Sequence, residues 1–402
     1  MEKTFSLKQF NKIFLFLNLF LLQAYLIRFK IFSYPSNVQE ILIFVQILLF
    51  AWLVIKEKRM SETFKNLKKY WVVIGFFGLA MLSILIVKIP NQLDLIRYLK
   101  FLFFGGALAI MFLETLRTDE EKRKGIYMLG AGAVMFGIFS VFYNLAGGNH
   151  QNDLRLAGPL DAAVYLGFYL APFLLFFTID FFENKKKPSL LLAILLGILI
   201  IATRSMGSVL GIFLTLSLYI FIKQKNKILK TFKAKLILTI LALIIFSAVF
   251  YTKILPTINT NYSSLDERGE IYQTSIYLLK ENPKNWLTGL GFGQFQYYFE
   301  HTADLALSRP PLDYYVLQPH NIFLLFIFNF GLLGLIFLLT IIYKILKNLI
   351  NVNSLPFFQL SAIFISVYFL IHGIIDTPFF KNDMLFLVML FWQIGTLKPI
   401  NK

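Results

Sequence analysis

The chain alternates long apolar runs with short polar loops over nearly its whole length. Runs of about twenty apolar residues are long enough to cross the hydrocarbon core of a bilayer as helices. We therefore predict an all-α polytopic membrane protein with about 12 transmembrane helices. Their expected ranges are 10–27, 38–55, 70–89, 93–113, 125–146, 162–182, 189–203, 206–222, 233–252, 320–343, 355–375 and 383–397.

One polar stretch, residues 253–319, interrupts this series and is the longest polar passage of the chain. A loop of this length in a compact protein usually has a function of its own, and its many aromatic residues favour a folded cap. Apolar spacing predicts a helix over 265–281 and a second, short helix near 293–307. We expect one integral membrane domain, with nine helices in 1–252, the cap in 253–319 and three helices in 320–402.

Charge distribution predicts the orientation of these segments. The net charge of +17 would favour a nucleic-acid partner in a soluble protein, but 57% hydrophobic content excludes that class. Of the 39 Lys and Arg residues, 26 fall on one side of the predicted membrane and 11 on the other, with Arg97 and Lys100 inside a span. The positive-inside rule then places both termini in the cytoplasm and the cap outside. Outside the membrane neither ATP nor nucleotide sugars are present, so a substrate must arrive already activated.

Some chemistry is disfavoured by the residues that are missing. The chain has no cysteine, which excludes disulfides, thiolate metal sites and thiol nucleophiles. It has no H-x-x-H, D-x-D or clustered carboxylate set, so we expect neither a catalytic metal nor another cofactor. The first apolar run lacks a small-residue cleavage site, and we expect it to be retained.

Two arginines at outer positions are candidate anion-binding groups. Arg204 divides the apolar stretch 189–222 and stands among small residues that leave room for a ligand. The alternative is an arginine that snorkels and only marks the end of a span. Arg268 lies at the start of the cap helix, where a cation opposes the helix dipole unless an anion is near. Its alternative is an exposed arginine paired with acidic neighbours.

His320 is the candidate general base. It follows Pro319 at the junction of the cap with the next span, which would hold its imidazole at the membrane surface. A neutral imidazole accepts a proton near neutral pH. The alternative is a polar residue that only starts a helix. The neighbouring Asn321 is a candidate for substrate binding.

Further candidates for substrate binding are weaker. Arg97 and Lys100 lie three residues apart on one helical face, and charges inside a membrane are often functional, although both could snorkel to the interface. Arg155 stands in a loop predicted to face outward, which could line one cavity together with the other outward candidate residues. Gly291 is the centre of a Gly-x-Gly-x-Gly turn whose backbone N–H groups could bind an anion.

A late pair at another outer span end, His372 and Asp376, is four residues apart. We expect it to form a local polar cluster that holds the last hairpin.

Together these features resemble the O-antigen ligase and O-antigen polymerase superfamily of bacterial membrane glycosyltransferases. The hydropathy pattern resembles that family over nearly the whole chain, and the specific motifs fall in about 150–335. The chain differs from the family pattern at Phe328–Asn329, where the family often has an acidic residue followed by a small one. The matching motifs are Asn152–Gly158, Ala202–Gly207, Arg268–Tyr272, Glu281–Pro283, Gly289–Gly291, His320–Asn321, Asn329–Gly334 and His372–Asp376.

The resemblance implies a metal-independent, inverting transfer of a glycan from a polyprenyl (undecaprenyl) diphosphate to an acceptor hydroxyl. This reaction belongs to lipopolysaccharide or other cell-surface polysaccharide synthesis at the bacterial cytoplasmic membrane. The family's essential arginines and histidine correspond to Arg204, Arg268 and His320. The arginines would neutralise the leaving diphosphate, and the histidine would accept the proton of the hydroxyl or position it.

Two alternatives stay open. A ligase and a polymerase differ only in the acceptor, which is a lipid core or protein in one and a second lipid-linked glycan in the other. A transporter of lipid-linked sugars would need polar residues in mid-span and a cavity that reaches both sides. The candidate residues here gather at outer span ends, which favours the transferase.

Overall fold

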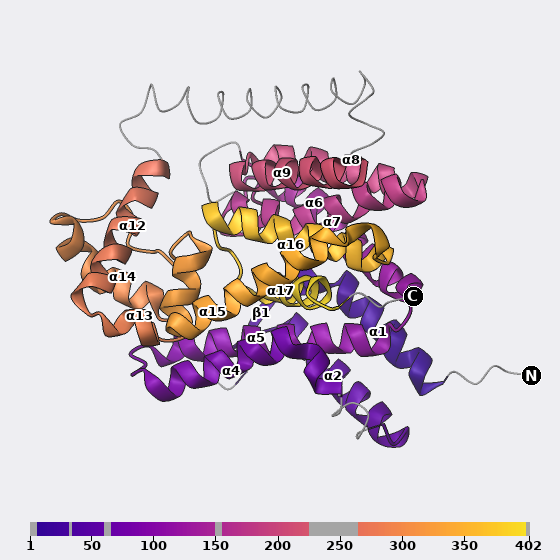
Figure 1. Cartoon of the computed structure of the whole chain (residues 1–402), viewed down its shortest axis with the longest axis horizontal. Helices are drawn as coiled ribbons and strands as arrows, with labels where there is room; N and C mark the ends of the chain where they lie inside the picture. The colour runs from indigo at the N-terminus through magenta and orange to yellow at the C-terminus, as the bar shows by residue number, and fades with distance from the viewer. Residues whose placement is uncertain (1–5, 32–33, 60–65, 149–154, 225–263, 399–402) are drawn as a thin grey trace, which may run out of the picture.

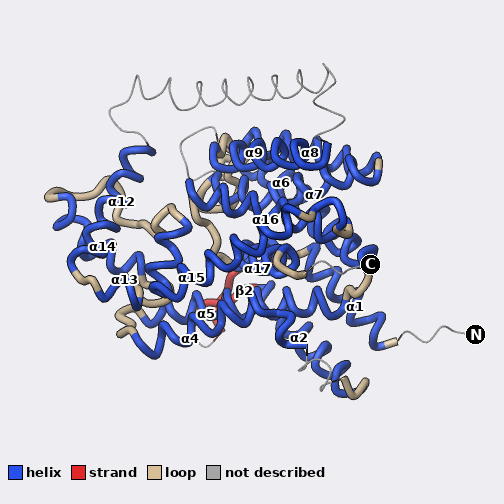
Figure 2. Tube along the Cα trace, in the orientation of Figure 1, coloured by secondary structure: helices blue, strands red, loops and turns tan. Residues whose placement is uncertain are grey.

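The computed structural model describes residues 6–31, 34–59, 66–148, 155–224 and 264–398. Helices make up most of it (Figure 1), and a single two-stranded hairpin is the only sheet of the described residues (Figure 2). The elements are α1 (Leu7–Phe20), η1 (Leu22–Leu26), β1 (Arg28–Ile31), β2 (Tyr34–Asn37), α2 (Val38–Lys56), η2 (Asn66–Tyr70), α4 (Trp71–Ile86), α5 (Gln92–Thr115), α6 (Asp119–Leu145), α7 (Ala163–Asn184), α8 (Lys187–Thr203), α9 (Met206–Gln224), α12 (Ser264–Glu281), α13 (Lys284–Thr288), α14 (Phe295–Leu307), α15 (Ile322–Ile350), η4 (Val352–Ser354), α16 (Phe357–Ile375) and α17 (Asn382–Gly395).

Ten of the twelve predicted spans correspond to helices, and eight of these have both ends within three residues of the prediction. Helix α6 begins six residues earlier than predicted, and α15 ends seven residues later. In the described residues, eight helices are long and apolar enough to cross a membrane, and α8 and α17 are shorter apolar helices. The predicted span 233–252 lies outside the described residues, so the total of twelve stays a prediction. The break at Arg204 is confirmed, because α8 ends at Thr203 and α9 begins at Met206.

The first predicted span, 10–27, is wrong in its second half. Helix α1 ends at Phe20, and after the turn η1 the chain forms the antiparallel hairpin of β1 and β2. Arg28 is opposite Asn37 in this hairpin. Aromatic and β-branched residues alternate with polar ones after position 27, which is a strand pattern that the apolar run before it concealed.

Side-chain caps mark several helix starts. Ser6 and Gln9 form a capping box at α1, and Thr118 and Glu121 form another at α6. The side chain of Asn321 accepts hydrogen bonds from the first backbone N–H groups of α15. The Asn321 side chain thus fixes the position at which the chain leaves the cap segment and enters helix α15 of the helical body.

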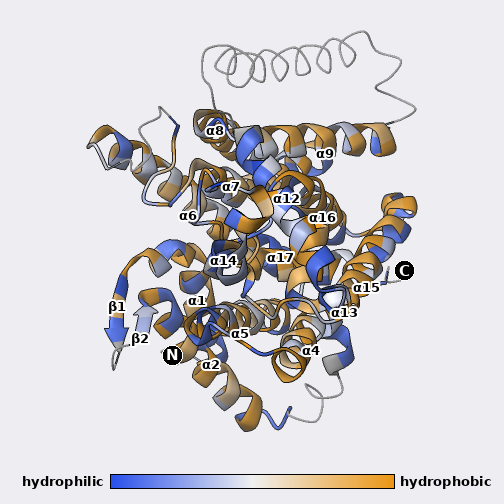
Figure 3. Ribbon diagram, turned by 90° about the vertical axis from the view of Figure 1, so that its left-hand side faces the viewer, coloured by the Kyte–Doolittle hydropathy of each residue, from blue (hydrophilic) through white to orange (hydrophobic). Residues whose placement is uncertain are grey.

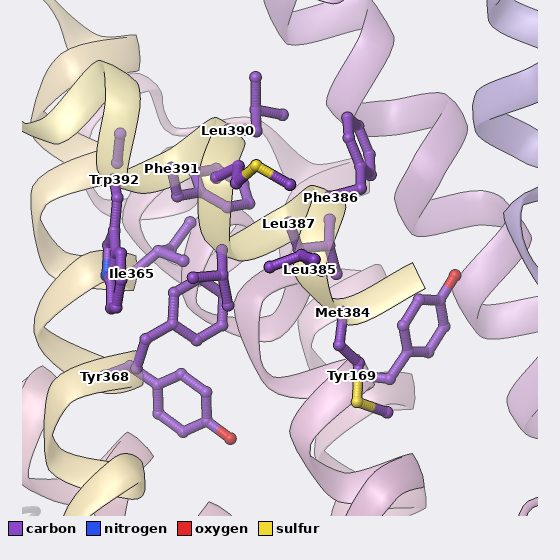
Figure 4. Close-up of a cluster of buried hydrophobic side chains, with 14 of the residues drawn as sticks. Tyr169, Ile365, Tyr368, Met384, Leu385, Phe386, Leu387, Leu390, Phe391 and Trp392 are labelled. Atoms are coloured by element: carbon purple, nitrogen blue, oxygen red, sulfur yellow. The ribbon is translucent and has the colours of Figure 1, made fainter. Parts of the chain in front are cut away.

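Helix α17 is the centre of the hydrophobic core. Every side chain from Met384 to Trp392 is buried, on all faces of the helix. Figure 4 shows these side chains among Tyr169 of α7 and Ile365 and Tyr368 of α16. Because α5, α16, α4 and α15 pack around it, α17 touches protein rather than lipid, which explains why its short length is sufficient.

The peripheral helices expose large apolar side chains instead. Coloured by hydropathy, the outer helices are predominantly hydrophobic along their length (Figure 3). Apolar surface of this extent is unusual in a soluble monomer and matches contact with hydrocarbon. The chain is therefore a multi-pass membrane protein. Examples of these exposed side chains are Trp52 on α2, Leu85 on α4, Leu191 and Ile198 on α8, and Phe221 on α9.

The cap consists of α12, α13 and α14 and lies at one end of the helical body, opposite the end at which α1 begins (Figure 1). Both predicted cap helices are confirmed, while the short α13 between them was not predicted. The cap has a hydrophobic core of its own, which includes Ile271, Leu278 and Phe299. Phe328 of α15 belongs to this core, so the cap is packed onto the membrane helices.

A break in α15 at Gly331 receives the cap. Gly331 has φ 64° and ψ −153°, a conformation that only glycine adopts readily. The Leu290 N–H donates to the Phe328 carbonyl (2.7 Å), and the Gly293 N–H donates to the side chain of Asn329 (2.8 Å). Asn329, which departs from the family pattern, therefore ties the glycine turn of the cap to α15.

We predict that Gly331→Ala lowers the melting temperature of the protein. A Cβ at this position would lie 2.1 Å from the Leu287 carbonyl oxygen, so α13 would have to move. Backbone strain at a left-handed residue alone costs about 1–2 kcal/mol. Gly78→Ala in α4 is the matched control, because nothing lies within 4 Å of its Cβ position. A thermal shift as small for Gly331→Ala as for the control would contradict this account of the break.

Candidate active site

A carboxylate and an imidazole meet where the cap joins the helical body. Asp376 directly follows α16, and His320 lies two residues before α15. Nδ1 of His320 donates a hydrogen bond to Oδ1 of Asp376 over 2.9 Å. His320 has φ 49°, a left-handed conformation that is costly for a non-glycine residue. Pro319 before it and the capping Asn321 after it hold this conformation.

Helix α12 of the cap supplies two more groups to the pair. Nη2 of Arg268 lies 3.9 Å from Oδ2 of Asp376. One turn later, the hydroxyl of Tyr272 donates to the backbone carbonyl of His320 (3.2 Å). Arg268 is therefore paired with Asp376 across the seam between the cap and the helical body.

Asp376 is negatively charged despite its burial. Only 5% of the residue is exposed, and burial by itself raises the pKa of its carboxyl. The facing His320, with its hydrogen bond, and then His372 and Arg268 more than offset this and lower the pKa to about 2. A carboxylate can only accept hydrogen bonds, so the neutral ring of His320 carries its proton on Nδ1 and its lone pair on Nε2.

His372 connects this cluster to the Arg204 segment. Its Nδ1 donates to the backbone carbonyl of Asp376 (3.1 Å), and its Nε2 is buried with no partner among the described residues. A Cβ at Gly207 would lie only 3.1 Å from this Nε2. The start of α9 therefore packs directly on the His372 ring.

Arg204 lies at the same outer end of the helical body. It is the residue after α8, has φ 49°, and is exposed. The backbone N–H of Leu156 donates to the carbonyl of Ala202 (3.0 Å), so the loop that carries Arg155 runs beside Arg204. The structure thus places Arg155 and Arg204 in neighbouring segments. Arg204 is three residues before Gly207, the glycine that packs on His372.

A cavity of about 250 Å³ opens beside the pair, between the cap and the outer ends of the helices. His320 and Asp376 line one part of it, and residues of the cap and of the loop before α7 line the rest. A concave site with a few convergent polar groups is the usual form of a ligand pocket. Its lining residues include Asp161, Tyr165, Glu267, Asp313, Tyr315 and Gln318.

The remaining predicted binding residues lie in different places. Arg97 is half exposed, pairs with Asp94 at 3.8 Å, and is near enough to Asp161 to help lower the pKa of that residue. Lys100 is bound to Glu40 at 2.9 Å in α2, so the structure does not bring it to the pair. Asn321 serves as the helix cap described above.

Gly291 packs against the loop before α5, where a Cβ would meet the Ile89 side chain at 2.9 Å. Two of the three glycine N–H groups of its turn donate to protein, from Gly289 to Asn285 and from Gly293 to Asn329. This turn therefore serves packing of the cap on α15 rather than forming an open ring of donors.

Sequence reasoning underestimated Asp376 and did not single out Tyr272 for a role. Asp376 was predicted only as part of a structural cluster, yet it is the shared partner of His320, Arg268 and His372. The available signal was its spacing of four residues from His372 at an outer span end. Tyr272 has the same spacing from Arg268 on α12, which places both on one face of the helix.

Among the described residues, no group of three or more His, Asp or Glu side chains is close enough to hold a metal ion. The cations near Asp376 are instead side chains, which are fixed in number and position by the fold.

Comparison with known families finds one match, in the middle of the chain. Residues 191–339 match the family described as O-Antigen ligase, and this range includes Arg204, Arg268 and His320. This match supports the resemblance to the O-antigen ligase superfamily that the motifs indicated. No curated protein matches the chain.

The low pKa of Asp376 predicts how acid affects stability. Its folded pKa of about 2 lies below the ordinary 3.8, so the charged form stabilises the fold above about pH 4 and this contribution is lost as the pH falls toward 2. The shift corresponds to roughly 2 kcal/mol. We expect the difference in melting temperature between wild type and Asp376→Asn to narrow steadily from pH 5 to pH 2.5. A gap that is constant or widens over this range would contradict the assignment.

Proposed function

We propose that this protein is an O-antigen ligase-like glycosyltransferase of the bacterial cytoplasmic membrane. It moves a glycan from a polyprenyl (undecaprenyl) diphosphate carrier to an acceptor hydroxyl on the outer side of that membrane. The observation that carries the proposal is the His320–Asp376 hydrogen bond beside a cavity, with Arg268 next to Asp376. His320 and Arg268 both fall in the family-matched region.

The arginines supply the charge that the leaving group requires. As the bond between the anomeric carbon and the diphosphate oxygen breaks, negative charge grows on the diphosphate. Guanidinium groups bind phosphate oxygens in pairs of hydrogen bonds, and they stabilise such charge most where water is scarce. Arg268 is held beside Asp376 by α12, while Arg204 and Arg155 stand exposed or partly exposed on neighbouring segments at the same end.

His320 activates the acceptor. Its Nε2 accepts the proton of the acceptor hydroxyl while the hydroxyl oxygen bonds to the anomeric carbon from the side opposite the diphosphate. This in-line displacement inverts the anomeric configuration. Asp376 orients the ring through Nδ1 and stabilises the imidazolium that forms, as the carboxylate does in other carboxylate–imidazole pairs. Charge is conserved, because the diphosphate leaves with the electron pair of the broken bond.

The orientation of the chain belongs to the same proposal. Both termini face the cytoplasm and the cap faces outward, which is supported by the excess of Lys and Arg in alternate loops. A polymerase would use the same donor and the same groups, and would differ in taking a second lipid-linked glycan as acceptor. A transporter has less support, because the described polar groups of the site gather at one end of the helical body.

The proposal predicts a loss of glycan transfer in two variants. His320→Ala removes the base, which contributes about 10²–10⁴-fold. Arg268→Ala removes a charge at the leaving group, for which about 10²–10³-fold is typical. The assay uses purified protein in lipid nanodiscs with an undecaprenyl-diphosphate-linked oligosaccharide, and follows release of the lipid diphosphate.

Lys280→Ala is the matched control, because Lys280 is exposed on the same helix α12 and its substitution also removes one positive charge. It should transfer glycan at the wild-type rate. Wild-type transfer by His320→Ala or Arg268→Ala would remove that residue from the mechanism. Movement of donor across the membrane by a His320→Ala variant, with no transfer by the wild type, would favour the transporter.

A further inference from the structure

The cavity beside His320 has a charge opposite to that of the arginines that face the donor. Of the described residues that line it, none is Lys or Arg, and five carry carboxylates. A diphosphate would be repelled from such a lining, so the donor phosphates belong on the arginine side. The five are Asp161, Glu267, Glu270, Asp313 and Asp376.

Three of the five carboxylates are balanced by cations of the fold. Asp161 pairs with Lys381 at 3.0 Å, and Glu270 pairs with Arg309 while accepting the backbone N–H of Leu312. Asp376 faces His320 and Arg268 as described above. Glu267 and Asp313 make no ion pair with a described residue and are exposed at the cavity, so a ligand there meets their charge.

A second observation, independent of charge, indicates that the cavity receives a polar ligand. Thr377 is only 1% exposed, lines the cavity, and its hydroxyl has no hydrogen-bond partner among the described residues. Oε1 of Gln318, which also lines the cavity, is likewise without a partner. A buried polar group that stays unpaired is unfavourable, so hydrogen bonds to the hydroxyl groups of a ligand would be stabilising there.

The size and apolar surfaces of the cavity fit one sugar ring. Its volume of about 250 Å³ is near the lower end of ligand pockets. Tyr165 and Tyr315 line it with aromatic surface, against which the C–H face of a sugar can pack. Hydroxyl groups at the ring edge would then reach Thr377, Gln318 and the Nε2 atom of His320.

We propose that this acid-lined cavity is the acceptor subsite, and that it takes a sugar that is uncharged or carries a free amine while rejecting one that carries a carboxylate. The inference rests on the proposed transfer reaction, since that reaction requires an acceptor hydroxyl at His320. Glu267 and Asp313 determine the selectivity: they attract an ammonium group and repel a uronate. Thr377 contributes affinity without regard to charge.

The test compares methyl glycosides of glucose, glucosamine and glucuronic acid, which share one ring and differ in a single substituent. Binding to the protein in phosphatidylcholine nanodiscs is measured by saturation-transfer NMR at pH 6.5 and low salt, where exposed charges are least screened. The wild type should bind the glucosaminide most tightly and the glucuronide at least about tenfold more weakly than the glucoside, a difference of about 1.4 kcal/mol.

Two variants and a control separate the roles. In Glu267→Gln/Asp313→Asn the three dissociation constants should agree within about twofold, a convergence expected from the loss of both charges. Thr377→Val should weaken all three probes alike, by roughly threefold or more, as expected for one lost hydrogen bond. Glu300→Gln removes a carboxylate from α14 that does not line the cavity, and it should keep the wild-type order.

Equal binding of the three probes by the wild type would overturn the inference, and so would the absence of saturable binding of any of them. Loss of discrimination in Glu300→Gln to the same degree as in the double variant would also overturn it. Because these measurements use no donor, they are separate from the transfer assay. If the wild type transfers glycan normally but binds the three probes equally, only the acceptor assignment is contradicted. If the wild type binds the probes selectively but transfers no glycan, only the proposed reaction is contradicted.

Discussion

The buried carboxylate of Asp376 holds the site together. A charge with so little exposure needs partners, and two side chains from separate segments provide them: His320 before α15 and Arg268 on α12. His372 on α16 donates to the backbone carbonyl of Asp376 and so holds the same residue in place. Each partner is thereby fixed in relation to the others. The imidazole of His320 obtains a defined tautomer, and the guanidinium of Arg268 is held at the seam between the cap and the membrane helices. The folding of the cap therefore also sets the relative positions of these two side chains.

The break in α15 also holds the cap on the membrane helices, and it does so through backbone hydrogen bonds. An unbroken helix would leave no backbone acceptor for the turn that follows α13, and the cap would rest only on side chains. With Gly331 in a left-handed conformation, the Phe328 carbonyl and the Asn329 amide accept hydrogen bonds from Leu290 and Gly293. The cap is thus tied to the helical body at two places: through this turn to α15, and through α12, whose Arg268 pairs with Asp376 after α16 and whose Tyr272 donates to His320 before α15.

Sequence alone predicted most of the fold, since helices such as α5, α7 and α16 are long apolar runs whose period and length are local properties. The hairpin after α1 was missed because an apolar run can form either helix or strand, and pairing between β1 and β2 decides the outcome. The chemistry of Arg268 and His320 was predicted by residue type and family motifs. Their common dependence on Asp376 was not, because that contact joins residues 56 or more positions apart and exists only once α12, α15 and α16 have packed.

The central claim is that Asp376 fixes the His320 ring with Nδ1 protonated and Nε2 free to accept a proton. The chain has four histidines, so ¹⁵N spectra of selectively labelled protein in lipid nanodiscs can be assigned by comparison with His320→Gln. In the wild type at pH 8, the His320 signals should be those of a protonated Nδ1 and an unprotonated Nε2, and Asp376→Asn should convert them to a mixture of tautomers. A wild-type His320 that is protonated on Nε2, or that does not change in Asp376→Asn, would contradict the account.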